Sequence, residues 1–107
     1  MSLDVSLTAM KLTVVFDWNI THNLGAMARE AGIYEALWRP EEVGINYAHQ
    51  LMVPLAAARL ALITEPEHFR KFAPENGWGT YEGLLEFVEK YMEACIENPD
   101  AEVRAYR

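Results

Sequence analysis

The segment from Thr80 to Glu97 carries the pattern that most restricts how this chain folds. Apolar side chains recur in it every three or four residues, as they do on one face of an α-helix. These side chains are Tyr81, Leu84, Leu85, Val88, Tyr91, Met92 and Cys95, and the opposite face carries Glu82, Glu86, Glu89, Glu93 and Glu97. The segment is therefore predicted to be a long helix with one buried side. Its acidic side is either a solvated face or a docking surface for a basic partner.

An earlier helix is expected to begin in the polar run Asn19–Asn23, because this run is rich in residues that cap helix N-termini. Apolar residues then recur at helical spacing: Leu24, Met27, Ala28, Ala31, Tyr34, Leu37 and Trp38. The helix should stop before Pro40, since a residue that precedes proline avoids the helical backbone conformation. The pattern therefore predicts one continuous helix up to Trp38.

A further helix is expected to follow Asn46, with Tyr47, Leu51, Leu55, Ala58 and Leu62 as its buried stripe. Pro54 lies inside this helix and predicts either a kink or a restart of the helix, because proline removes a backbone hydrogen bond. A short helix is expected after Pro66 and extends through Phe72.

Two segments are predicted to be strands. Lys11 to Trp18 alternates, with Leu12, Val14, Phe16 and Trp18 on one face, and Ala101 to Tyr106 alternates near the other end. Residues 1–9 precede Met10 and are either an added leader or an extra strand, since Leu3, Val5 and Leu7 also alternate.

These elements predict an α+β fold that is mostly helical, with residues 10–107 as a single domain. Three to four helices would pack on a short two-stranded ribbon formed by the N- and C-terminal strands. Two strands make a marginal sheet, so either the helices cover the ribbon or a second copy of the chain extends it. The second alternative favours a homodimer.

The net charge of −7, from 16 acidic and 9 basic residues, argues against nucleic acid and against anionic membranes as partners. Cys95 is the single cysteine, so no intrachain disulfide forms. With no signal peptide in this sequence, a cytoplasmic setting is expected. The uncharged run from Val43 to Ala58 is too short and too polar to span a bilayer.

Three places in the sequence concentrate groups that bind ligands. The first is the strand-to-helix junction with Asn19, Thr21, His22 and Asn23, where one residue is enough to cap the helix and the others are either solvated or bind a ligand. The second is Trp38 and Arg39, which offer a flat ring and a planar cation, or else close the core and pair with glutamates. The third is Asn76 to Gly79, a tight loop around Trp78 whose backbone approaches either a ligand or the protein itself. The candidate ligand-binding residues are Asn19, Thr21, His22, Asn23, Trp38, Arg39, Asn76 and Trp78.

Catalytic and metal-binding patterns are not readable in this sequence. His22, His49 and His68 have no zinc-ligand spacing, and no nucleophile elbow or phosphate loop is present. We therefore predict no cofactor and no metal, and Asp17 with His22 is the alternative pair of ligands if a metal does bind. Catalysis would require His22 as the acid–base group.

Four motifs resemble those of a family of small uncharacterised proteins encoded by bacteriophages, prophages and some bacteria. They are Asn19-Ile20-Thr21-His22-Asn23-Leu24, Ala31-Gly32-Ile33-Tyr34, Leu37-Trp38-Arg39-Pro40 and Asn76-Gly77-Trp78-Gly79. The resemblance runs from about Trp18 onward. It implies a cytoplasmic accessory protein and supplies no activity and no site residues.

The leading functional hypothesis is a non-catalytic binding module for a small polar or anionic ligand. Thr21 and Asn23 would supply hydrogen bonds, Arg39 charge, and Trp38 or Trp78 a stacking face. The alternative is a protein–protein interaction module that uses the acidic helix face or a strand edge. A small hydrolase or transferase is the third hypothesis.

Overall fold

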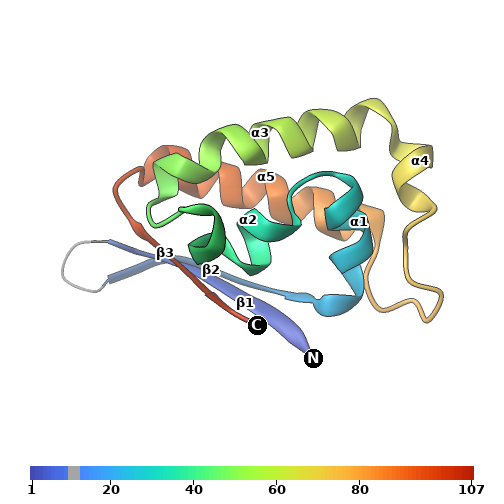
Figure 1. The fold of residues 1–107 in the computed structure, drawn as a ribbon, viewed down its shortest axis with the longest axis horizontal. Coiled ribbons are helices and arrows are strands. Elements are labelled where there is room, and N and C mark those ends of the chain that lie inside the picture. The colour runs from blue at the N-terminus through green and yellow to red at the C-terminus, as the bar shows by residue number, and fades with distance from the viewer. Residues whose placement is uncertain (10–12) are drawn as a thin grey trace.

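The computed structural model describes residues 1–9 and 13–107, which form a three-stranded antiparallel sheet covered on one face by helices (Figure 1). The strands are β1 (Ser2–Ala9), β2 (Thr13–Thr21) and β3 (Glu102–Tyr106), in the order β2-β1-β3. The α+β class and the largely helical content are confirmed. The part of the first predicted strand at Lys11 and Leu12 lies outside the described residues.

The prediction of a two-stranded ribbon is wrong, because β1 lies between the two strands that were expected to pair. Ser2–Ala9 forms the extra strand, and Leu3, Val5 and Leu7 are fully buried in the core. Val5 pairs with Trp18 on β2 and with Ala105 on β3. Three strands with an apolar inner face are enough for a stable sheet. The sheet therefore no longer supplies a reason to expect a homodimer.

Strand β2 turns its aromatic residues toward the helices, as the alternation predicts. Phe16 and Trp18 are half-buried and Ile20 is buried. The register with β1 shifts at Leu7/Thr8, where Val15 is the extra residue of a bulge. The shift breaks the alternation, so Val14, which was predicted on the same face as Phe16 and Trp18, is 54% exposed.

The predicted continuous helix before Pro40 is instead three short segments: η2 (His22–Leu24), α1 (Gly25–Glu30) and α2 (Tyr34–Trp38). Gly32 ends α1 with a φ of 76°. The amide of Gly32 donates to the carbonyl oxygen of Arg29, and the amide of Ile33 donates to that of Ala28. This pair of bonds is the Schellman pattern that closes a helix, and glycine permits it.

The remaining helices are η3 (Pro40–Val43), α3 (Ala48–Thr64), α4 (Pro66–Arg70) and α5 (Tyr81–Glu97). Helix α3 continues through Pro54, so the predicted restart does not occur. The cap of α3 is Tyr47 rather than Asn46, and Gln50 accepts hydrogen bonds from the amides of both residues. Helix α5 begins as predicted, with the hydroxyl of Thr80 accepting from the amide of Gly83 at 2.9 Å.

The core lies between the sheet and α5, with α3 packed on α5 farther from the sheet (Figure 1). Phe16 on β2 stacks on Tyr91 of α5 with ring centroids 5.2 Å apart, and Trp18 lies 6.2 Å from Phe87. These aromatic contacts fix α5 across the inner face of β2. Within the described residues, no helix has the length and apolar content required to cross a membrane.

Candidate functional site

An open hollow of about 380 Å³ lies where β2 ends and the short helices begin. It is lined by His22, Gly25, Arg29, Tyr34, Trp38, Arg39 and Arg107. We call these seven residues the arginine pocket. Three guanidinium groups in one hollow are notable in a chain whose net charge is −7.

One hydrogen bond joins the strand junction to helix α2. The indole Nε1–H of Trp38 donates to Nδ1 of His22 at 2.8 Å. An indole nitrogen can only donate, so Nδ1 of His22 must carry a lone pair, and the proton of the neutral imidazole is on Nε2. The ring therefore has one N–H group left with which to bind a ligand.

The aromatic wall of the pocket is already stacked. Tyr34 and Trp38 lie with ring centroids 4.9 Å apart and planes inclined by 12°, and the guanidinium carbon of Arg29 lies 3.9 Å from the Tyr34 centroid. Trp38 is only 2% exposed. The stacking fixes the Tyr34 ring, and the cation–π contact holds Arg29 over that ring. Trp38 therefore contributes to the wall and presents no free face for a ligand ring.

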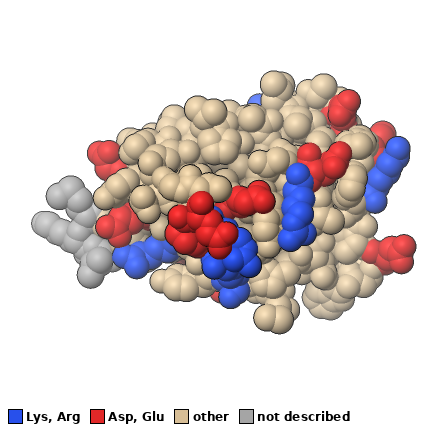
Figure 2. Space-filling model, viewed as in Figure 1, with Lys and Arg blue, Asp and Glu red and all other residues tan. Residues whose placement is uncertain are grey.

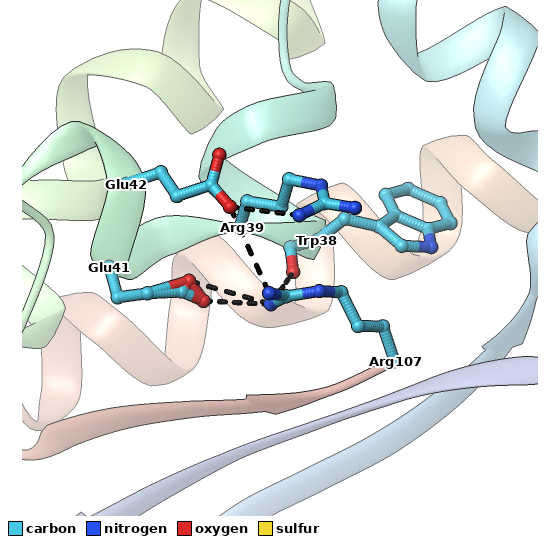
Figure 3. Close-up of polar contacts among 5 residues, drawn as sticks. All are labelled: Trp38, Arg39, Glu41, Glu42 and Arg107. Carbon is cyan, nitrogen blue, oxygen red and sulfur yellow. Dashed lines mark hydrogen bonds and ion pairs between the residues drawn. The ribbon is translucent and has the colours of Figure 1, made fainter.

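Two arginines of the pocket are held by glutamates of η3 (Figure 3). Nη1 of Arg39 bonds to Glu42 at 2.8 Å, and Nη1 of Arg107 bonds to Glu41 at 2.8 Å and to the Trp38 carbonyl oxygen at 3.1 Å. Bonding to Glu42, and secondarily to Tyr34, raises the pKa of Arg39 above its already high ordinary value. The network of bonds to Glu41, Glu42 and the Trp38 carbonyl oxygen fixes the positions of both guanidinium groups.

Arg29 differs from the other two pocket arginines, because it has no carboxylate partner within the part of the chain that the structure describes. The charges of Arg39 and Arg107 are balanced by Glu41 and Glu42. The guanidinium of Arg29 therefore gives the pocket an excess positive charge.

The structure brings His22, Trp38 and Arg39 together and leaves the other predicted residues of the junction outside the pocket. Asn19 lies on the sheet face away from the helices, where its side-chain amide donates to Ser2 and to Asp4, each at 2.8 Å. Thr21 caps η2 by accepting from the amide of Asn23 at 3.2 Å, and the Asn23 side chain is exposed. Capping therefore accounts for Thr21, which is one of the two roles that the sequence left open for the junction.

The loop around Trp78 also lies outside the pocket. The Asn76 side chain accepts from the Trp78 amide at 2.9 Å, and Trp78 itself is 72% exposed. Gly79 has a φ of +113°, and a Cβ placed on it would lie 2.9 Å from Cγ2 of Thr21. The close approach that the two glycines predict is therefore to the protein itself.

Four pocket residues were not predicted: Gly25, Arg29, Tyr34 and Arg107. The spacing of Tyr34 and Trp38 by four residues in a helix was the one available signal, because such side chains are neighbours on a helix surface. Arg107 lies 69 positions from Trp38, and no local pattern could place it there.

The acidic face of α5 is partly neutralised within the chain. Glu82 is bound by Arg70 at 2.7 Å and Glu89 by Arg59 at 2.8 Å. Lys90 lies 3.5 Å from Glu93. The bond to Arg70 lowers the pKa of Glu82. A groove of about 500 Å³ runs along this face, beside Leu85 and Met92.

Within residues 1–9 and 13–107, no cluster of three or more histidine, cysteine or acidic side chains is arranged to hold a metal ion. Comparisons of this chain with protein families, with curated proteins and with solved structures gave no match.

Proposed function

We propose that the protein is a binding module for a small anion, a carboxylate or a phosphate, held in the arginine pocket. The observation that carries this proposal is the guanidinium of Arg29, which has no carboxylate partner in the described chain and lies beside two further arginines. Guanidinium groups bind carboxylates and phosphates through two parallel hydrogen bonds, and this geometry gives both strength and direction.

The pocket is prepared for such a ligand before binding. The Tyr34 ring positions Arg29, and the η3 glutamates position Arg39 and Arg107. A preformed site loses less side-chain entropy when a ligand binds. The Nε2–H group of His22 is a further donor, since Nδ1 is occupied by Trp38.

The size of the pocket limits the ligand class. Its volume of about 380 Å³ lies near the lower end of the range for small-molecule sites. The hollow is open and Trp38 has no free face, so recognition would rest on charge and hydrogen bonds rather than on stacking. We therefore propose a ligand of metabolite size, bound with an affinity in the micromolar to millimolar range, about −4 to −8 kcal/mol.

The test is a ¹H–¹⁵N NMR titration with inorganic phosphate, citrate and adenosine 5′-monophosphate as separate probes. We expect shifts of the Trp38 indole N–H and of the backbone from His22 to Arg39 with at least one probe. Arg29→Gln should weaken binding about tenfold or more, because a charge-assisted bidentate contact is lost.

Arg70→Gln is the matched control. Arg70 also lies over a tyrosine ring, 4.7 Å from the Tyr81 centroid, but it is bound by Glu67 and Glu82. This variant should bind the probes like the wild type. Equal loss in both variants, or no shift in the pocket with any of the three anions, would refute the proposal.

The rival hypothesis is a protein-interaction module that uses the acidic face of α5. Three glutamates of that face already have cations within the chain, so a basic partner would have to displace Arg59, Arg70 or Lys90. The free-energy cost of breaking these ion pairs favours the arginine pocket over the acidic face of α5 as the binding site. We also propose, from the four sequence motifs alone, that the protein is a cytoplasmic accessory protein of phages or bacteria.

A further inference from the structure

Helix α3 has an apolar outer face in addition to its buried one. Val53 is 80% exposed, Leu60 is 62% exposed and Ile63 is 42% exposed, and Ala56 and Ala57 between them are exposed too. Their spacing of three and four residues places them in one stripe along the helix. We call these five residues the α3 stripe.

The opposite side of α3 packs on the core through Ala48, Leu51, Leu55, Ala58 and Leu62. A helix that is apolar on all sides is normally covered on all sides. Arg59 is the only Lys, Arg, Asp or Glu in α3, and Glu89 of α5 holds its guanidinium at 2.8 Å. Figure 2 shows that the upper surface of the molecule, where α3 runs, is largely free of charged side chains.

We propose that the α3 stripe is the interface of a symmetric homodimer in which two copies of α3 pack antiparallel. From Val53 to Leu60 the stripe reads large, small, small, large in either direction. A twofold axis between Ala56 and Ala57 therefore places Val53 of each copy against Leu60 of the other, with the alanines at the crossing. A twofold interface requires such self-complementarity, and small residues at the crossing allow the helices a close approach.

The lack of charged side chains in the α3 stripe favours a second copy as the occupant of this face. The net charge of −7 makes two copies repel each other elsewhere on the surface. The uncharged stripe is a face on which two copies can meet without placing like charges together.

The dimer should be weak. A helix of 17 residues is about 25 Å long, and a contact of one such pair lies near or below the roughly 1,200 Å² of a standard interface. We expect a dissociation constant on the order of 10–100 μM. Added salt should tighten the dimer, because it screens the repulsion between the two acidic chains.

The test is sedimentation velocity over a dilution series of the full chain, from about 1 μM to 1 mM, a range that brackets this affinity. Val53→Lys and Leu60→Glu should each produce a monomer, because each buries a charge at the interface. A mixture of the two variants should associate again, since the introduced ammonium of one copy then faces the introduced carboxylate of the other. The second contact of that mixed dimer joins a native Val53 to a native Leu60. This rescue reports the antiparallel register.

Two control variants test whether the loss of association is specific to the α3 stripe. Ile96→Glu changes an apolar side chain on α5 that is 55% exposed, and Val14→Lys changes the exposed edge of β2. Both should dimerise like the wild type. A wild type that stays monomeric throughout the series, a dimer that survives Val53→Lys, or a dimer abolished by Val14→Lys would overturn the proposal.

Discussion

The indole N–H of Trp38 is bonded to Nδ1 of His22 at 2.8 Å, which ties helix α2 to the end of strand β2. The two residues are 16 positions apart, and the donor belongs to a side chain that is almost completely buried. This bond makes His22 both a structural partner and a wall of the arginine pocket.

We predict that His22→Phe lowers the free energy of unfolding by about 1–3 kcal/mol, because the buried indole N–H then lacks an acceptor. Urea denaturation measures this loss. His49→Phe should change stability by less than about 0.5 kcal/mol, because His49 is exposed. If Trp38→Phe removes the same free energy in the His22→Phe background as in the wild type, the bond contributes nothing and the prediction is wrong.

We predict that Gly79→Ala destabilises the fold more than Gly77→Ala does. Both glycines have positive φ, +113° at Gly79 and +78° at Gly77, so alanine costs about 1–2 kcal/mol at either position. At Gly79 the new Cβ would also lie 2.9 Å from Cγ2 of Thr21 and 3.0 Å from Cγ of Leu24, while at Gly77 it meets open space. Thermal unfolding of the two variants under identical conditions compares them, and equal melting temperatures would contradict the proposed close packing.

Short sequence patterns correctly predicted those helices and strands that are determined by residues close together in the sequence. The apolar period of α5 and its start near Thr80 were predicted correctly, because burial on one face is a pattern that acts within a few residues. The break at Gly32 was missed, since Ala31 and Tyr34 continue the apolar period across it. For α3 the buried stripe was largely correct, although the exposed apolar side chains opposite it were not recognised.

Short sequence patterns also predicted only part of the candidate site. His22 and Trp38 were both predicted as ligand-binding residues, and the structure joins them. Arg107 reaches the pocket only because β3 pairs with β1, a consequence of long-range strand pairing that no short motif contains. Asn19 was misplaced because the strand continues through Thr21 and the alternation turns its side chain away from the helices.

We predict that Cys95 in the folded protein resists alkylation at about pH 8, because burial disfavours the thiolate and raises the pKa of the thiol to about 12. In the unfolded chain the thiol ionises from about pH 9 upward, while the folded state keeps its proton. Stability should therefore be unaffected below that pH and fall as pH rises above it, by at most about 1.4 kcal/mol per pH unit.

Burial also raises the pKa of Tyr91, which acts in the same direction. Urea denaturation of wild type and of Cys95→Ala between about pH 8 and pH 11 isolates the contribution of the thiol, and the variant should show the shallower slope. Identical slopes, or rapid alkylation of the native protein, would show that the thiol is accessible.

We predict that the chain cannot fold without β1. Leu3, Val5 and Leu7 are buried on the inner face of the central strand, and both β2 and β3 pair with β1 rather than with each other. Deleting residues 1–9 would leave two separated strands and expose the core, so far-UV circular dichroism should show loss of the cooperative urea transition.

A point substitution tests the same strand without removing it. Leu7→Ala should cost about 2–5 kcal/mol, as expected for a large side chain removed from a packed core. Ser6→Ala, on the opposite face of the same strand, should change stability by less than about 0.5 kcal/mol. A truncated chain that unfolds cooperatively at the wild-type urea midpoint would show that β2 and β3 can close the sheet alone, and the central position of β1 would then be incidental to the fold.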